Sequence, residues 1–313
     1  MTETPGFTLG IDLGGTKVRT VALAADGGSP IPVWSTTTPT PAHFPPAAMV
    51  SLVRDMVGRA TGELGASPAG IGIGFPGLVD AHAGRICSSV IIDGWADVPL
   101  VSLVEEVVGR PCSVDNDVNN AARAEVAARR AIDDPAGDLL FISLGTGIGG
   151  AVILDGKIWR GVAGLAGEVG HMAGGDHDDP CDCGGNGCVC RQASGRAVER
   201  ALGIAPGSLA HTLAAAPWEL SVSSGGGPGA VVSTAAVRLG RVVADAMNLL
   251  NLPLVCLGGG MSDIDGLVEA VDANFRRQAM VEVAASCRVE HAVAGSDAGA
   301  VGSALLARTG TLV

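Results

Sequence analysis

Two segments of the chain repeat one pattern, in which two apolar strands flank a glycine-rich turn. Residues 7–12 alternate apolar and polar positions before the first turn, and residues 18–24 follow it as a second β-like run. Residues 139–144 and 149–154 repeat this order of strand, turn and strand around the second turn. A chain that builds the same strand–turn–strand unit twice predicts a duplicated, two-lobed fold with a cleft between the lobes.

The segments around these two units predict an α/β fold. Met49, Val53 and Met56 keep a helical period that continues to Leu64, and an amphipathic helix is predicted over residues 234–250. Ile71 and Ile73 lie in a predicted strand that precedes Gly77, and a buried strand is predicted over residues 254–257. The Gly-, Ser- and Pro-rich stretch 206–229 predicts a loop. This alternation of helices and strands is typical of α/β proteins.

Composition excludes several classes of protein. The chain has 313 residues, a formal net charge of −12 and 47% hydrophobic residues, so a disordered chain is excluded. The acidic balance argues against nucleic acid as a partner, because a phosphate backbone is bound by clustered Lys and Arg. An apolar run of about 20 residues, which a membrane helix needs, is lacking, and residues 1–6 lack a signal-peptide core. We therefore expect no membrane contact and a cytoplasmic location.

The first glycine-rich turn is a candidate phosphate site. It contains Asp12, Gly14, Gly15, Thr16 and Lys17. Glycines let backbone N–H groups approach phosphate oxygens, and a carboxylate at the strand end can hold Mg²⁺ through water. A hairpin turn with a surface Asp is the alternative interpretation, and the Walker A pattern is absent.

Further glycine-rich turns follow two other strands. Gly145, Thr146 and Gly147 lie in the second turn, and four glycines within residues 145–150 favour phosphate binding over a simple turn, because glycine weakens strands. Gly259 and Gly260 follow a buried strand and suit the close approach of a purine or ribose. They are equally typical of a helix start.

Asn116 and Asp117 follow a predicted strand over residues 112–115 and precede an Ala-rich helix that extends to about Ala131. Ligands bind α/β sheets at such strand ends. A carboxylate there can accept the proton of an attacking sugar hydroxyl, while an amide holds a neighbouring hydroxyl. The alternative role of Asp117 is to cap the helix, and the two roles are compatible.

A cysteine cluster predicts a structural zinc site. Cys181, Cys183, Cys188 and Cys190 lie within ten residues and follow His171. Four thiolates, or three thiolates and an imidazole, form a closed tetrahedral Zn²⁺ site. Glu168 precedes His171 by three residues, so one helical turn would place both on one face, with Glu168 free to accept hydrogen bonds from a sugar. A surface Glu on a helix is the alternative.

Taken in order, these motifs resemble the ROK family of sugar kinases, repressors and open reading frames, and the kinases among them are glucokinase-like. The resemblance rests on residues 10–17, 115–121, 145–150, 167–171, 181–188, 194–195 and 297–302. It implies an actin/hexokinase-like (ribonuclease H-like) ATPase fold, ATP, Mg²⁺ and a homodimer or homotetramer.

The resemblance also implies residue roles. Asp117 matches the general base, Asn116, Glu168 and His171 match ligands of sugar hydroxyls, and Gly77 is a further candidate for substrate binding. The implied zinc ligands are His171, Cys181, Cys183 and Cys188. We predict an N-terminal lobe over residues 1–125 with the first turn and Asp117. A C-terminal lobe over residues 126–313 would carry the second turn, the zinc loop and the adenosine site, and its last helix is a candidate for return to the first lobe.

Two departures bear on the substrate. Cys190 stands where kinases of the family usually have a Glu that contacts the anomeric end of the sugar, and residues 88–92 lack a frequent Pro-Asn pair. Phosphorylation of a hexose such as glucose, at its 6-hydroxyl, is the main prediction. A modified sugar, such as the aminosugar kanosamine or a C7 cyclitol, is the alternative, and polyphosphate is an alternative donor. A non-catalytic sensor or transcriptional regulator is disfavoured, because the sequence offers no helix-turn-helix region before residue 7.

Overall fold

The computed structural model describes residues 6–25, 29–41, 43–89, 92–134, 137–209, 212 and 227–309. Parts of the predicted loop 206–229 and of the segment 88–92 lie outside these residues. The chain forms two compact units. Unit 1 comprises Met1–Pro135, Lys157–Ala166 and Val293–Val313, and unit 2 comprises Ala136–Gly156 and Gly167–Ala292.

Unit 1 is built on a five-stranded mixed sheet of order β3-β2-β1-β4-β8. Strand β1 pairs antiparallel with β2, which pairs antiparallel with β3, whereas β1 and β4 are parallel, as are β4 and β8. The predicted first hairpin is therefore present. The strands are β1 (Phe7–Leu13), β2 (Lys17–Ala24), β3 (Trp34–Pro39), β4 (Pro68–Phe75) and β8 (Cys112–Asn116).

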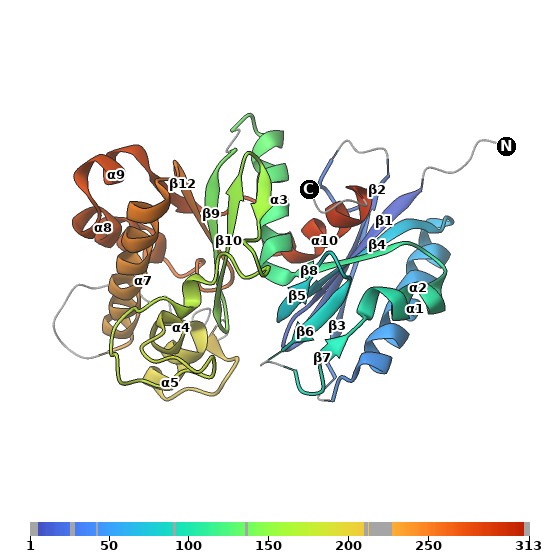
Figure 1. Cartoon of the computed structure of the whole chain (residues 1–313), viewed down its shortest axis with the longest axis horizontal. Coiled ribbons are helices and arrows are strands. Elements are labelled where there is room, and N and C mark those ends of the chain that lie inside the picture. Colours follow the sequence, from blue (N-terminus) through green and yellow to red (C-terminus); the bar gives the residue numbers. More distant parts are fainter. Residues whose placement is uncertain are drawn as a thin grey trace. The chain divides into compact units, whose positions relative to one another are not determined.

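Helices cover both faces of this sheet (Figure 1). Val18 and Ala22 of β2 pack into one core with α1 and α2, and Val21 and Leu23 pack into a second core with α3 and α10. This alternation follows from the two-residue period of a strand. The elements are α1 (Pro46–Leu64), α2 (Leu100–Val108), α3 (Asp117–Ala131) and α10 (Ala298–Thr309), with a small sheet of β5 (Leu78–Asp80), β6 (Arg85–Ser88) and β7 (Ala96–Val98).

Helix α10 approaches its neighbours so closely that only glycine fits at the contacts. A Cβ atom on Gly302 would lie 1.7 Å from the carbonyl oxygen of Asn120 in α3. A Cβ atom on Gly72 of β4 would lie 1.8 Å from the carbonyl oxygen of Ser303. The side chains of Asn120 and Ser303 also hydrogen-bond at 3.0 Å. These contacts fix α10 against β4 and against α3, the helix that begins at Asp117.

The strands of unit 2 lie in a second five-stranded sheet of order β11-β10-β9-β12-β13, whose edge strand β11 belongs to the segment Lys157–Ala166 of unit 1. In this sheet β9 and β10 are antiparallel, and β9, β12 and β13 are parallel. Its hairpin and parallel strands follow the order of the first sheet, so the predicted duplication and the α/β class are confirmed. The strands are β9 (Leu139–Leu144), β10 (Ile148–Leu154), β11 (Lys157–Trp159), β12 (Leu254–Gly258) and β13 (Arg288–His291).

The helices of unit 2 form a single large core with its sheet, in which α7 and α8 pack side by side (Figure 1). Helix α7 begins six residues before the predicted start at residue 234, because Pro228 occupies its first turn, where a missing N–H costs nothing. The helices are η1 (Val169–His171, a 3₁₀ turn), α4 (Val189–Ala193), α5 (Gly195–Leu202), α7 (Pro228–Leu250), α8 (Leu267–Gln278) and α9 (Val281–Ser286).

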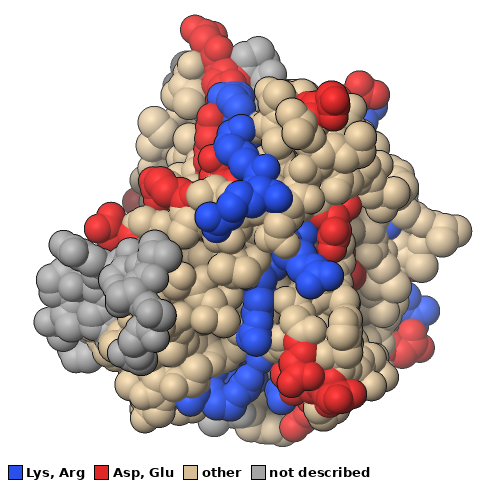
Figure 2. Space-filling model, turned by 90° about the vertical axis from the view of Figure 1, so that its left-hand side faces the viewer, with Lys and Arg blue, Asp and Glu red and all other residues tan. Residues whose placement is uncertain are grey.

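The surface charge is mixed even where basic side chains gather. Figure 2 shows Lys and Arg side chains in a line down one face, with Asp and Glu side chains beside them.

Among the described residues, the structure contains no helix that is both long enough and apolar enough to cross a bilayer.

Candidate functional site

The carboxyl end of β8 presents Asn116 and Asp117. Asn116 has an extended backbone, and its Oδ1 accepts hydrogen bonds from the amides of Val118, at 2.9 Å, and Asn119, at 3.2 Å. Asn116 is thus the N-cap of α3, and the predicted cap at Asp117 was wrong by one residue. Asp117 is the first helical residue, where its negative charge is stabilised by the helix dipole.

Gly77 lies beside this turn. Its carbonyl oxygen accepts a 3.2 Å hydrogen bond from Nδ2 of Asn116. A Cβ atom at position 77 would lie 2.5 Å from the carbonyl oxygen of Ser88, so the close approach requires glycine. Two of the predicted substrate-binding residues are therefore in direct contact.

Asp12, near the end of β1, is a half-buried carboxylate with an unusual ionisation. Burial, together with repulsion from Asp117, raises the pKa of Asp12 from 3.8 to about 7, against an opposing effect of Lys17. Gly299 of α10 makes room for it, because a Cβ atom there would lie 2.4 Å from Oδ2 of Asp12. Two carboxylates that repel each other in this way are a suitable ligand set for a divalent cation.

The first glycine turn is a tight hairpin tip. The amide of Gly14 donates to the carbonyl oxygen of Lys17 at 2.9 Å, and the hydroxyl of Thr40 donates to the carbonyl oxygen of Gly14 at 2.7 Å. Gly15, Thr16 and Lys17 are exposed, and a Cβ atom on Gly15 would meet nothing within 4 Å. The tip therefore has open space beside its backbone.

Three glycine-containing segments meet at one edge of the second sheet. The amide of Gly195, at the start of α5, donates to the carbonyl oxygen of Gly145 at 2.8 Å. Gly259 adopts a left-handed conformation, and a Cβ atom there would lie 2.5 Å from the carbonyl oxygen of Leu144, the last residue of β9. Thr146, Gly147 and Gly260 are exposed beside these contacts. The predicted nucleotide-binding residues of unit 2 are thus neighbours.

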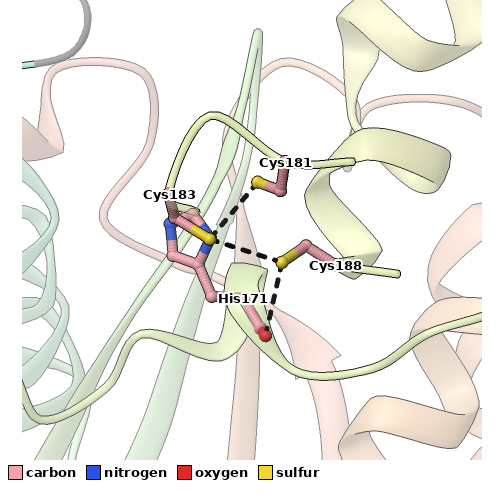
Figure 3. Close-up of side chains that lie close together, drawn as sticks. All are labelled: His171, Cys181, Cys183 and Cys188. Atoms are coloured by element: carbon pink, nitrogen blue, oxygen red, sulfur yellow. Dashed lines mark hydrogen bonds between the residues drawn. The ribbon is translucent and has the colours of Figure 1, made fainter. Parts of the chain in front are cut away.

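The four predicted zinc ligands converge in unit 2 (Figure 3). One ligand atom from each of His171, Cys181, Cys183 and Cys188 lies within 4.8 Å of the others. Sγ of Cys183 is 3.6 Å from Sγ of Cys188, and Sγ of Cys181 is 3.7 Å from Nδ1 of His171. With a Zn–S bond of about 2.3 Å, neighbouring ligands of a tetrahedral zinc lie about 3.7 Å apart, so this spacing fits the ion.

Cys190 lies outside this group. Its Sγ accepts a 3.4 Å hydrogen bond from the amide of Ile148, the residue that follows the second glycine turn. Burial raises the pKa of the Cys190 thiol. Of the two ligand sets that the spacing allows, the geometry favours His171 with three cysteines, and Cys190 instead adjoins the turn of Gly147.

Glu168 directly precedes the short 3₁₀ turn η1, and His171 is its last residue, so the turn predicted between them is 3₁₀ rather than α-helical. Nδ1 of His171 faces Cys181, whereas its Nε2 is 3.8 Å from Oε2 of Glu168. A carboxylate next to the second nitrogen of a metal-binding imidazole fixes the orientation of its ring. Both side chains are exposed, so both are accessible to a ligand.

The sequence patterns missed a buried ion-pair cluster beside Asn116. Asp115, with 2% of its side chain exposed, pairs with Arg123 and Arg160. Arg160 is 45 residues away in the chain. The sequence shows only that Asp115 is an acidic residue at the end of a predicted strand, and this does not indicate which residues pair with it.

The predicted site residues divide between the units. Unit 1 holds Asp12, Gly14, Gly15, Thr16, Lys17, Gly77, Asn116 and Asp117; unit 2 holds Gly145, Thr146, Gly147, Glu168, His171, Gly259, Gly260 and the cysteines.

A duplicated α/β fold with glycine turns at the sheet ends defines the class of actin/hexokinase-like ATPases. The chain belongs to the ROK family, whose model matches residues 8–310. It is 32% identical to a glucokinase of Halalkalibacterium halodurans (96% of this chain, 94% of the relative). It is 33% identical to an N-acetylmannosamine kinase of Salmonella paratyphi A (97% and 99%). A ROK family glucokinase from Streptomyces griseus, in complex with glucose and AMPPNP, superposes with a TM-score of 0.78 at 28% identity (97% and 100%).

Proposed function

We propose that this protein is an ATP-dependent kinase that phosphorylates a hexose such as glucose at its 6-hydroxyl. The observation that carries the proposal is the pair of Asn116 and Asp117 at the end of β8, with Asp12 near enough for its charge to interact with Asp117. The names of the related proteins, which are sugar kinases, support the same class of reaction.

In the proposed step, Asp117 acts as general base. It accepts the proton of the sugar hydroxyl while the hydroxyl oxygen bonds to the γ-phosphorus of ATP and the bond to the β–γ bridging oxygen breaks, which releases ADP. Asn116, held by Gly77 and by the amides of α3, orients a neighbouring hydroxyl.

Asp12 is the candidate Mg²⁺ ligand, because burial and the negative charge of Asp117 raise its pKa despite the positive charge of Lys17, and a bound cation would offset that effect. Bound Mg²⁺ would neutralise charge on the phosphates of ATP. The exposed backbone at Gly14–Lys17 and at Gly145–Gly147 is proposed to donate N–H groups to phosphate oxygens, and Gly259 and Gly260 are proposed to adjoin the nucleoside. The zinc of His171, Cys181, Cys183 and Cys188 is proposed to be structural, because four protein ligands leave no open position.

Cys190 favours a second candidate, a kinase for a modified sugar such as an aminosugar or a C7 cyclitol. Its thiol is half-buried and accepts a hydrogen bond from the amide of Ile148. A thiol in this position does not provide the charged hydrogen-bond acceptor that a Glu would offer to a sugar. A charged hydrogen bond contributes roughly 1.5–3 kcal/mol, which is enough to change the preferred substrate. Glu168 and His171 remain proposed sugar ligands in both cases.

A screen of ADP release with Mg-ATP decides between these candidates. Its panel is glucose, mannose, N-acetylmannosamine, N-acetylglucosamine, kanosamine and a C7 cyclitol, with polyphosphate as a second donor. Turnover on glucose establishes the main proposal, and turnover on a modified sugar alone establishes the second. Lack of turnover on the whole panel would exclude the kinase proposal for these substrates.

The base is tested by Asp117→Asn. We expect turnover to fall by about 10³-fold or more, because a general base contributes roughly 10²–10⁴-fold and Asn cannot accept the proton. The dissociation constant of the sugar, measured by calorimetry, should change less than about threefold. Asp93→Asn, at an exposed position, is the matched control and should keep full activity. Retained turnover in Asp117→Asn would refute the assignment.

A further inference from the structure

The carboxylate of Asp115 has its hydrogen-bonding capacity filled. Oδ1 accepts from the amide of Asn116 at 2.9 Å and from Nδ2 of Asn119 at 3.0 Å. Oδ2 accepts from Nη2 of Arg123 at 3.2 Å and from Nη2 of Arg160. A carboxylate has about four acceptor sites, so this one is saturated. Its first two bonds fix the turn that presents Asn116 and Asp117.

The two arginines are equally buried but differently anchored. Their side chains are 13% and 14% exposed, respectively. Arg123 is part of α3 and also donates to Oδ1 of Asn120 at 2.6 Å, so it is held within its own helix. Arg160 comes from the distant segment 157–166, and its buried Nε has no hydrogen-bond partner among the described residues. An unsatisfied buried donor costs stability, so Arg160 is poorly explained as a stabilising residue alone.

The backbone of Arg160 also takes part in closing the loop that follows it. Its carbonyl oxygen accepts a 3.1 Å hydrogen bond from the amide of Ala166, which closes a loop of glycine-rich chain. Gly161 and Gly164 in this loop adopt left-handed conformations, and the side chain of Val162 is fully exposed. The loop therefore has little packing of its own. Gly167 and Glu168 follow Ala166 directly in the chain.

We propose that the ion pair between Asp115 and Arg160 anchors the loop 160–166 to the end of β8, and that Arg160 is thereby a positioning residue for sugar binding. The pair connects the turn of Asn116 and Asp117 with the loop that leads into Glu168, a proposed sugar ligand. This inference rests on the proposed function only for its effect on the sugar. The anchoring of the loop is independent of it.

The test compares Arg160→Met with Arg123→Met, because each removes one guanidinium from the same carboxylate at equal burial. We expect Arg160→Met to raise the KM for the sugar at least tenfold, with the KM for ATP and kcat within about twofold. Arg123→Met should lower Tm at least as much but change the sugar KM less than threefold. Arg160→Lys, which keeps the charge, should recover part of the loss. Hydrogen exchange of the amide of Ala166 should accelerate in Arg160→Met only.

The exchange measurement separates the two proposals. Selective exchange in Arg160→Met, in a protein without sugar kinase activity, would support the anchoring and overturn the proposed function. Equal effects of both variants on exchange and on KM would overturn the anchoring, and Asp115 would then be a structural carboxylate. An effect of Arg160→Met on kcat alone would overturn the role in sugar binding.

Discussion

The two units share one sheet order but hold their site segments in different ways. In unit 1, buried contacts hold the site segments in place. Asp115 pairs with two arginines, and α10 packs through Gly302 against α3. In unit 2, residues 176–186 form a loop whose residues are all described, and none of them is fully buried. Its internal bonds are mainly between backbone groups, such as Cys181 to Gly185 at 2.8 Å.

This difference shows where each unit obtains its order. A network of buried ion pairs is specified by the chain alone, and it needs only the fold to form. An exposed, glycine-rich loop buries too little apolar surface to offset its conformational entropy. The cluster of His171 and three cysteines supplies the missing constraint when a metal joins it. We therefore expect unit 2, and not unit 1, to depend on zinc.

Removal of the metal should have the largest effect. Cys188→Ser should reduce bound zinc from one per chain to less than about 0.1, measured by elemental analysis, and should destabilise unit 2 by more than about 3 kcal/mol. Hydrogen exchange should increase in the loop of unit 2 while unit 1 stays protected. Cys190→Ser, a nearly isosteric change two residues away, should keep its zinc. Loss of zinc in Cys190→Ser would instead support the set of four cysteines.

The complementary experiment destabilises unit 1 and leaves the zinc site unchanged. Gly302→Ala places a Cβ atom 1.7 Å from the carbonyl oxygen of Asn120, and the nearest atoms all belong to the backbone of Asn120, which cannot move aside as a side chain can. We expect a loss of about 3 kcal/mol in the free energy of unfolding, with zinc content unchanged. Gly58→Ala, in the exposed interior of α1 with nothing within 4 Å, is the control and should stabilise by up to about 1 kcal/mol. Denaturant titration measures both, and an equal effect at the two positions would contradict the close packing of α10.

The sequence predicted the parts of the fold that have a clear local pattern. Helix α1 was found from its helical period and α3 from its alanine content, whereas both glycine hairpins and β12 were found as short apolar runs beside glycines. For α10, the sequence predicted a last helix, as a candidate for return to the first lobe, but not the residue at which it begins. It packs on β1, β4 and α3 at once, so its small residues are buried on several sides and show no amphipathic stripe. Strand β3 lies at the edge of its sheet and contains three threonines, so it has no apolar pattern by which the sequence could have identified it.

Local contacts of the candidate site were predicted better than distant ones. Asn116, Asp117, His171 and the cysteines stood out because their chemistry and spacing are local in the chain. The pairing of Asp115 with Arg160 depends on how the fold brings two remote segments together, so spacing carries no signal for it. The raised pKa of Asp12 likewise depends on burial and on Asp117, which only the folded chain brings near.

The smallest expected effect concerns Asp12 in the zinc-loaded protein without Mg²⁺ or nucleotide. Its pKa is about 7 in the folded chain and 3.8 ordinarily, so between these values the folded protein holds a proton that the unfolded chain has released. Stability should therefore fall as the pH rises from about 4 to 7. Asn at position 12 cannot ionise, so the variant Asp12→Asn should lack this fall. The difference in the free energy of unfolding between Asp12→Asn and the wild type should therefore grow by about 2 kcal/mol between pH 5 and pH 8, after allowance for screening by solvent. Urea unfolding at both pH values measures it, with Asp93→Asn as the exposed control. Because Mg²⁺ would compensate the charge of Asp12, its addition at pH 8 should remove most of the difference, and a difference that Mg²⁺ leaves unchanged would argue against Asp12 as its ligand.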